Sequence, residues 1–218
     1  MAYIDPSLAR GYAKELLRGE ADEIKRKMGR ISVEANQGSQ RDGPVFKRLV
    51  KQIESGFADR MLLAIDCRPN EDARIYYILY GVDDRQEPRA RVIGVVLRKK
   101  KAKRMDVFPV PLIIYRHVIE RLILRTGHKT FKEFTPELAA ALNGPLQLHL
   151  QAKEWPHLYA ENGSYCLPSP SGAFFGEKAG THLKILTFVD NDKFTDTQRA
   201  RHDTITQKII DIMKETSE

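Results

Sequence analysis

The sequence predicts an α+β protein whose antiparallel sheets are flanked by helices. Runs rich in Ile, Val, Leu and Tyr cluster at 60–98 and at 146–190, and each run has the length and composition of a strand. The segments between neighbouring runs, such as RPNEDA and DDRQEPR, are short and turn-like, which favours antiparallel neighbours over parallel crossovers. Apolar residues at helical spacing lie on either side of both clusters.

In the first half, the sequence predicts two helices and then three strands. Ser7 caps a first helix of about twenty residues, which Gly19 interrupts. The polar stretch from Ser32 to Pro44 indicates a loop or hinge. The second helix is expected over Val45–Gly56, and the strands over 60–67, 74–82 and 91–99.

The second half is expected to centre on a helix over Pro109–Thr126, after a short strand at 105–110. Thr135-Pro136 favours the start of a short helix that ends by Gly144, and LQLHLQA alternates as a strand does. Further strands are expected at 165–167, 173–176 and 182–190, before a last helix that starts at Thr195 with a capping box and runs to about Met213.

Composition limits the class of protein. The 218 residues are 42% hydrophobic, which suits a globular fold. No apolar run approaches the roughly 18 residues that span a membrane, so we expect a soluble, cytoplasmic protein with no membrane partner. Cys67 and Cys166 lack metal-site spacing, so they are expected to be reduced and buried, with one disulfide as the alternative. Nucleotide, dinucleotide, zinc-protease and calcium motifs are missing, and we expect no metal and no cofactor.

Positive charge is concentrated in the first half. Residues 1–104 hold 23 Lys and Arg against 15 Asp and Glu, whereas residues 105–218 hold 13 against 14. The run RKKKAKR marks the boundary between an N-terminal α+β region, 1–104, and a C-terminal α+β domain, 105–218. It is either a solvated loop or a handle for nucleic-acid phosphates. Its six cations are Arg98, Lys99, Lys100, Lys101, Lys103 and Arg104.

The central helix carries the candidate site. His117, Arg121 and Arg125 follow one another at a spacing of four residues, so they form a row along one side of the helix. The row drifts towards the apolar face, and half-desolvated cations need carboxylate or phosphate partners. The alternative is an ordinary surface helix in which Glu120 supplies charge balance.

Three segments carry a resemblance. The His-x-x-x-Arg-x-x-x-Arg helix, the strand Gly172-Ala-Phe-Phe-Gly176 and the strand Leu186-Thr187-Phe188-Val189 resemble the core of metal-independent ribonuclease toxins of the barnase and RelE type. They are also similar to uncharacterised bacterial proteins of mobile elements that share a His-x-x-x-Arg-Leu helix. The resemblance implies that His117, Arg121, Arg125 and Thr187 are functional. The general-base carboxylate of barnase-like enzymes has no counterpart that the sequence identifies.

These residue types fit RNA cleavage without a metal. A histidine can move a proton at the 2′-hydroxyl or the leaving oxygen, while two arginines clamp the phosphate. Trp155, Tyr159 and Tyr165 are candidates to stack on bases. His149 or His157 is a candidate to supply a second acid or base. RNA is expected over DNA, together with a neutralising protein partner. One alternative is a nucleic-acid-binding or protein-interaction module without catalysis. Another is a structural protein in which the cations of this row, at the seam between core and solvent, pair with Asp190 or Asp192.

Overall fold

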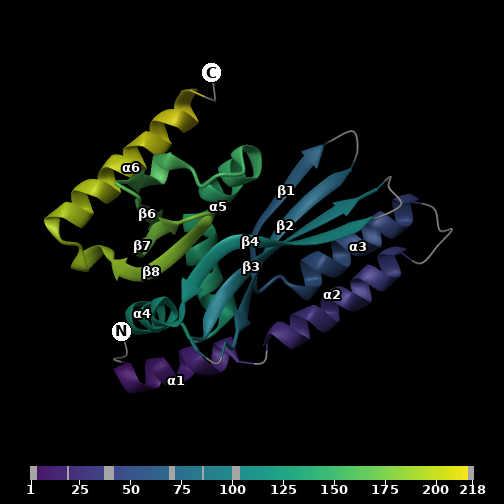
Figure 1. Cartoon of the computed structure of the whole chain (residues 1–218), viewed down its shortest axis with the longest axis horizontal. Coiled ribbons are helices and arrows are strands. Elements are labelled where there is room, and N and C mark those ends of the chain that lie inside the picture. The colour runs from purple at the N-terminus through teal and green to yellow at the C-terminus, as the bar shows by residue number, and fades with distance from the viewer. Residues whose placement is uncertain are drawn as a thin grey trace.

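The computed structural model confirms the α+β class (Figure 1). It describes residues 4–18, 20–36, 42–68, 72–84, 86–99 and 104–215. The helices among these residues are α1 (Pro6–Leu17), α2 (Glu20–Asn36), α3 (Asp42–Gly56), α4 (Arg116–Thr126), α5 (Phe131–Ala152), η1 (His157–Tyr159), η2 (Asn191–Lys193) and α6 (Asp196–Glu215). The strands are β1 (Met61–Arg68), β2 (Ala73–Val82), β3 (Arg89–Arg98), β4 (Met105–Tyr115), β5 (Ala160–Glu161), β6 (Ser164–Ser169), β7 (Gly172–Ala179) and β8 (His182–Asp190).

The strands of the described ranges form one continuous sheet in the order β1-β2-β3-β4-β8-β7-β6-β5. All neighbours are antiparallel except β4 and β8, which run parallel where Leu112 lies opposite Leu183 and Ile114 opposite Ile185. The prediction of a separate sheet in each half is therefore corrected. The two antiparallel units are joined through the parallel pair, and α4 and α5 lie in the connection between its strands.

Helices cover both faces of the sheet (Figure 1). Alternate residues of β2 pack into two different cores, one on each face of the sheet. Tyr76 and Ile78 belong to the core under α2 and α3. Tyr77 and Leu79 belong to the core that contains α4 and α5. Both sets are almost completely buried, which explains why β2 is a continuous apolar run. α1 packs on α4, and α6 lies against β6.

The helix expected over Pro109–Thr126 is half strand. β4 continues to Tyr115, and α4 begins only at Arg116. Two prolines in PVPLIIY cannot donate the backbone hydrogen bonds of a helix interior, and Ile113 and Ile114 lie opposite residues of β8 instead. The apolar residues before Arg116 thus belong to a buried strand, a pattern that periodicity alone does not distinguish from a helix.

The N-terminal helix is two helices. The cap of α1 is Asp5, not Ser7, because the Asp5 carboxylate accepts a hydrogen bond from the backbone N–H of Ser7 at 2.8 Å. α1 ends at Leu17, and α2 continues to Asn36, into the stretch expected to be a loop from Ser32 onward. Residues 37–41 of that expected loop lie outside the described residues, and its last three residues, 42–44, form the start of α3.

The short helix and strand expected between Thr135 and Gln151 are one helix, α5. It starts at Phe131 because Thr130 and Glu133 form a capping box, in which the Glu133 carboxylate accepts the Thr130 N–H at 2.9 Å. The Thr135 hydroxyl donates to the carbonyl of Asp59 and caps no helix. The capping box expected at Thr195 is confirmed, since its hydroxyl and the Gln198 side chain bond each other's backbone N–H.

The two cysteines form no disulfide with each other. Cys166 is buried, and burial raises the pKa of its thiol to about 11. Cys67 is exposed on the edge strand β1, which corrects the expectation that both are buried. Among the described residues, no helix is long and apolar enough to cross a membrane, and no three His, Cys, Asp or Glu side chains are grouped to hold a metal ion.

Candidate nucleic-acid interface

α4 carries His117, Arg121 and Arg125, which we call the His117 row, and its opposite face is packed into the core. Its apolar stripe is completely buried and consists of Val118, Ile119, Leu122 and Ile123. The helix ends at Gly127, whose left-handed backbone (φ 77°) lets its N–H bond the carbonyl of Ile123. His117 and Arg121 lie on the exposed side of the helix. Burial of one stripe therefore fixes the direction in which the row points.

The three members of the row have different surroundings. The His117 ring stacks on Tyr115, with centroids 6.2 Å apart and planes 20° from parallel. Arg121 makes no hydrogen bond or ion pair with the residues that the structure describes. Arg125 Nη1 lies 3.7 Å from Oδ2 of Asp190, and both side chains are partly buried. The pairing of a seam cation with Asp190, which the structural alternative expects, is thus present for Arg125.

Glu120 faces the other flank of α4 and ties it to α1. Its carboxylate accepts a hydrogen bond from Arg116 Nε at 2.8 Å and lies 4.0 Å from Arg10 Nε. Lys129, just after α4, also contacts α1, because its amine lies 5.3 Å from the centre of the Tyr12 ring. Glu120 does supply local charge balance, but to Arg116 and Arg10 rather than to the His117 row.

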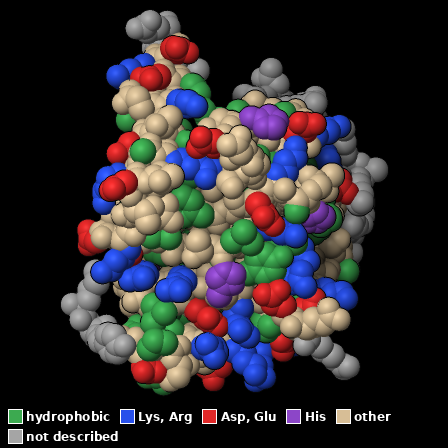
Figure 2. Space-filling model, turned by 60° about the vertical axis from the view of Figure 1, so that its left-hand side comes forward, with side chains coloured by type: hydrophobic (Ala, Val, Ile, Leu, Met, Phe, Trp, Pro, Cys, Tyr) green, Lys and Arg blue, Asp and Glu red, His purple; other side chains and the backbone are tan. Residues whose placement is uncertain are grey.

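Together the two helices form a surface with excess positive charge, which we call the α1–α4 basic surface. α1 and residues 116–129 contain two carboxylates, Glu15 and Glu120. Figure 2 shows groups of Lys and Arg side chains over the face of the molecule that carries α4 and α6, with Asp and Glu between them. The six cations of this surface are Arg10, Lys14, Arg116, Arg121, Arg125 and Lys129.

Thr187 does not join this surface. It lies opposite Phe175 in the β7–β8 pairing, and the Phe175 ring contacts Phe194 just before α6. The next residue, Phe188, points to the other face, where it contacts Phe174 in the core shared with α4. Because successive side chains of a strand alternate, Thr187 faces away from α4. The register of β8 therefore directs Thr187 away from the His117 row, contrary to the expectation that these residues converge.

The described cations of the basic run have partners inside the fold. Arg98 pairs with Asp106, and Lys99 pairs with Asp72. Arg104 Nη2 lies 2.6 Å from Asp42 Oδ1, and its other amino group donates to the carbonyl of Ala35. The Arg98–Asp106 pair joins β3 to β4, and Arg104 joins the start of β4 to α2 and α3. Lys100, Lys101 and Lys103 lie outside the described residues.

The aromatic candidates are structural. Trp155 is only 1% exposed, donates its ring N–H to the carbonyl of Thr181 and stacks on His149 with centroids 4.3 Å apart. It is therefore not available to stack on a base, which corrects that expectation. Tyr165 is equally buried and donates its hydroxyl to the carbonyl of Trp155. His157 is exposed at the start of η1.

Two carboxylates, Asp190 at the end of β8 and Glu137 of α5, are partly or almost completely buried. Oδ1 of Asp190, beside Arg125, is buried and has no hydrogen-bond partner within the described ranges. Glu137 of α5 is 7% exposed and accepts two hydrogen bonds from Ser171, from its N–H at 3.2 Å and from its hydroxyl at 2.5 Å. Nothing in the spacing of Glu137 along the chain separates it from a solvent-exposed helical residue, so sequence reasoning passed over it.

Comparison of the chain with protein-family models, with curated proteins and with solved structures gives no significant match. The resemblance to barnase-like and RelE-like ribonuclease toxins stays a prediction that rests on the residues quoted for it.

Proposed function

We propose that this protein binds nucleic acid, RNA before DNA, through phosphate contacts from the α1–α4 basic surface. The observation that carries the proposal is the exposed guanidinium of Arg121, which has no ion pair with the residues that the structure describes. It lies one helical turn from the exposed ring of His117. An arginine without a carboxylate partner is free to bind a phosphate with both amino groups. The resemblance of the His-x-x-x-Arg-x-x-x-Arg helix to ribonuclease toxins, which stays a prediction, favours RNA as the ligand.

The length of the His117 row suits contact with several nucleotides of a nucleic-acid strand better than contact with a single phosphate. At about 1.5 Å of rise per residue, His117 and Arg125 are roughly 12 Å apart along the helix axis. A nucleic-acid strand rises about 3.4 Å per nucleotide, so the row covers roughly three or four nucleotides. Contacts of this kind fix the position of the backbone and carry no sequence information.

RNA cleavage is a second candidate, which the position of Asp190 favours. Its carboxylate lies beside the Arg125 guanidinium, where a base and a phosphate clamp would act together. His117 is two helical turns away, too far to serve as the acid at the same phosphate. Cleavage would therefore need another acid, whereas binding needs none, and we rank binding first. A toxin-like role with a neutralising protein partner goes with this second candidate.

The proposal predicts a specific salt dependence. His117→Gln/Arg121→Gln should weaken the retention of a labelled single-stranded RNA, and the slope of log affinity against log salt should fall by about 0.7 for each phosphate that the variant no longer neutralises. Melting temperature should hardly change, because both side chains are exposed. Fluorescence anisotropy over a salt titration measures the slope.

Arg26→Gln is the matched control, because Arg26 is an exposed cation of α2 that forms no hydrogen bond or salt bridge with the described residues. An equal fall in slope for the control would show that net charge, rather than the α1–α4 basic surface, drives binding. Neutralising Lys99, Lys100, Lys101 and Lys103 in the same assay tests the basic run, and unchanged retention would make that run a solvated loop.

The same RNA incubated in EDTA separates the two candidates. Cleavage that Asp190→Asn abolishes, with RNA retention kept, would support the ribonuclease. Retention without cleavage supports the binding module. If His117→Ala cleaves as fast as the unaltered protein, His117 has no part in the chemistry.

A further inference from the structure

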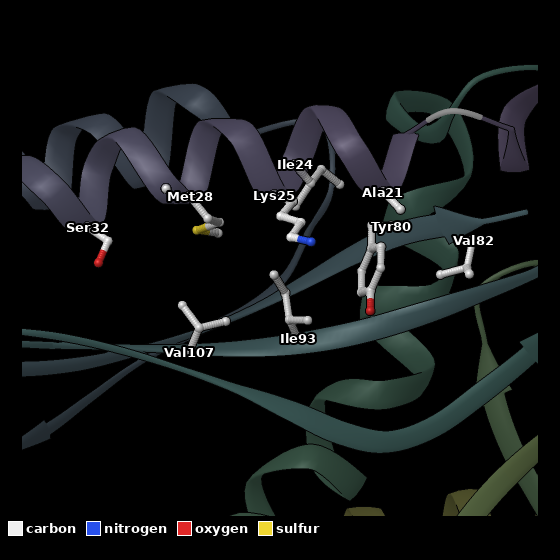
Figure 3. Close-up of a pocket in the computed structure, with 10 residues that line it drawn as sticks. Ala21, Ile24, Lys25, Met28, Ser32, Tyr80, Val82, Ile93 and Val107 are labelled. Carbon is white, nitrogen blue, oxygen red and sulfur yellow. The ribbon is translucent and has the colours of Figure 1, made fainter.

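A cavity of about 530 Å³ lies between α2 and the sheet, on the face opposite to α4 and α5 (Figure 3). Its walls are apolar side chains from two sides. Ile24 and Met28 project from α2, while Ile93 and Val107 project from the sheet towards them. This volume lies within the range of about 300–1,000 Å³ that is usual for small-ligand sites.

Three polar groups border this apolar space. The Lys25 side chain reaches from α2 towards the sheet, and Figure 3 shows its amine directed into the gap beside Tyr80. Lys25 has no ion pair with any residue in the described part of the chain. The hydroxyls of Ser32 and Tyr80 complete the set. Burial raises the pKa of the Tyr80 phenol, which favours its neutral form, a hydrogen-bond donor.

We propose that this cavity binds a small amphiphile with a carboxylate head, such as a medium-chain fatty acid. The apolar walls take the chain, because burial of each methylene contributes about 0.8 kcal/mol. The Lys25 amine, which has no ion pair among the described residues, supplies the charge that complements a carboxylate. The site lies across the sheet from α4, so it is separate from the α1–α4 basic surface and does not depend on the proposed function.

A helical glycine provides a test that leaves folding intact. Gly29 lines the cavity, and a Cβ placed on it would meet nothing within 4 Å. Gly29→Leu therefore puts a side chain into open space, and it replaces a poor helix former with a good one. Gly11 of α1 is equally exposed and equally open, and it lies outside the cavity. Gly11→Leu is the matched control.

Laurate is the probe, and the methyl group of Met28, followed by NMR, is the reporter inside the cavity. We expect laurate to shift the Met28 methyl resonance saturably, and dodecyltrimethylammonium, which has the same chain with a cationic head, to bind far more weakly. Lys25→Gln should weaken laurate binding about ten- to hundredfold, the range for a lost charge-assisted hydrogen bond. Lys208→Gln, a neutralised exposed lysine of α6, should leave binding unchanged.

Gly29→Leu should abolish laurate binding while the protein melts at the same or a higher temperature, and Gly11→Leu should bind laurate as the unaltered protein does. Equal binding of the cationic and anionic probes, or unaltered binding by Gly29→Leu, would overturn the proposal. So would a dimer that Gly29→Leu converts to a monomer without any laurate binding, because the cavity would then be an interface. Binding to anionic lipid vesicles but not to free laurate would also overturn it.

Discussion

Gly172→Ala is expected to lower the free energy of unfolding by at least about 3 kcal/mol, the upper end of the usual cost of overpacking. A Cβ at Gly172 would lie 2.1 Å from the carbonyl oxygen of Val189 and 2.9 Å from the Cα of Asp190. Both are backbone atoms of the neighbouring strand, so no side-chain rotation relieves the clash. The β7–β8 pairing must open at the rung where Gly172 lies opposite Asp190.

Urea unfolding followed by circular dichroism measures this loss, and Gly29→Ala is the control. Gly29 is a helical glycine with open space around its Cα, so alanine there should stabilise the protein by up to about 1 kcal/mol. The opposite signs of the two Gly→Ala changes follow from their surroundings alone. An unchanged urea midpoint for Gly172→Ala would mean that β7 and β8 lie further apart than in this structure.

The same geometry gives the Gly172-Ala-Phe-Phe-Gly176 motif a structural meaning. A Cβ at Gly176 would lie 2.3 Å from the carbonyl oxygen of Lys184, again a backbone atom of β8. Both glycines permit close approach of two strands, and Phe174 between them packs on Phe188 in the core. The motif was predicted to be part of a strand, which is confirmed. Its resemblance to a ribonuclease strand stays a prediction, because sheet packing alone requires these glycines.

Strands could be predicted from the sequence wherever both ends carried turn residues. The runs that became β1, β2 and β3 are apolar, short and bounded by polar segments, so composition and length agree. Prediction was wrong where two patterns overlapped. Leu146, Leu148 and Leu150 alternate as a strand does, yet they belong to α5, which begins after the capping box at Thr130 and contains Pro136 and Pro145.

The parallel joint between β4 and β8 could not be predicted. Local pattern describes how each strand meets its neighbour in sequence, and every such neighbour here is antiparallel. The β4–β8 pair joins Leu112 to Leu183 across α4, α5 and the strands β5, β6 and β7. A contact so distant in sequence leaves no periodicity to detect, so the sequence indicated two sheets where the chain forms one.

The candidate site, like the fold, could be predicted from the sequence only in part. The His117 row was predicted from helical spacing, and His117 and Arg121 do lie exposed on one helix. The structural alternative named Asp190 as a partner for this row, and Asp190 does pair with Arg125. The pairing of Arg104 with Asp42 could not be predicted, because ion pairs depend on which distant carboxylate the fold brings near. A run of cations in the sequence is thus a weaker sign of a free binding surface than a single unpaired arginine in the structure.

Glu137→Ala is expected to lower the free energy of unfolding by about 2–3 kcal/mol, because the carboxylate accepts two hydrogen bonds from Ser171 in a nearly buried position. Its removal leaves the Ser171 N–H and hydroxyl without their acceptor where α5 meets the β6–β7 turn. The higher helix propensity of alanine offsets only a few tenths of a kcal/mol of this cost. Glu137→Gln retains one carbonyl oxygen as an acceptor, so its loss should be about half as large.

A double-mutant cycle with Ser171→Ala distinguishes this hydrogen-bonded pair from a general effect of helix surface charge. Ser171→Ala removes the hydroxyl donor, so the double variant should be more stable than the sum of the single losses predicts, with a coupling of about 1 kcal/mol. Glu15→Ala, in an exposed position of α1, should change stability by less than about 0.5 kcal/mol. Strict additivity of Glu137→Ala and Ser171→Ala in urea unfolding would contradict the pairing. A coupling of the expected size would show that a single buried carboxylate fastens α5 to the turn between β6 and β7, next to the strand end that carries Asp190.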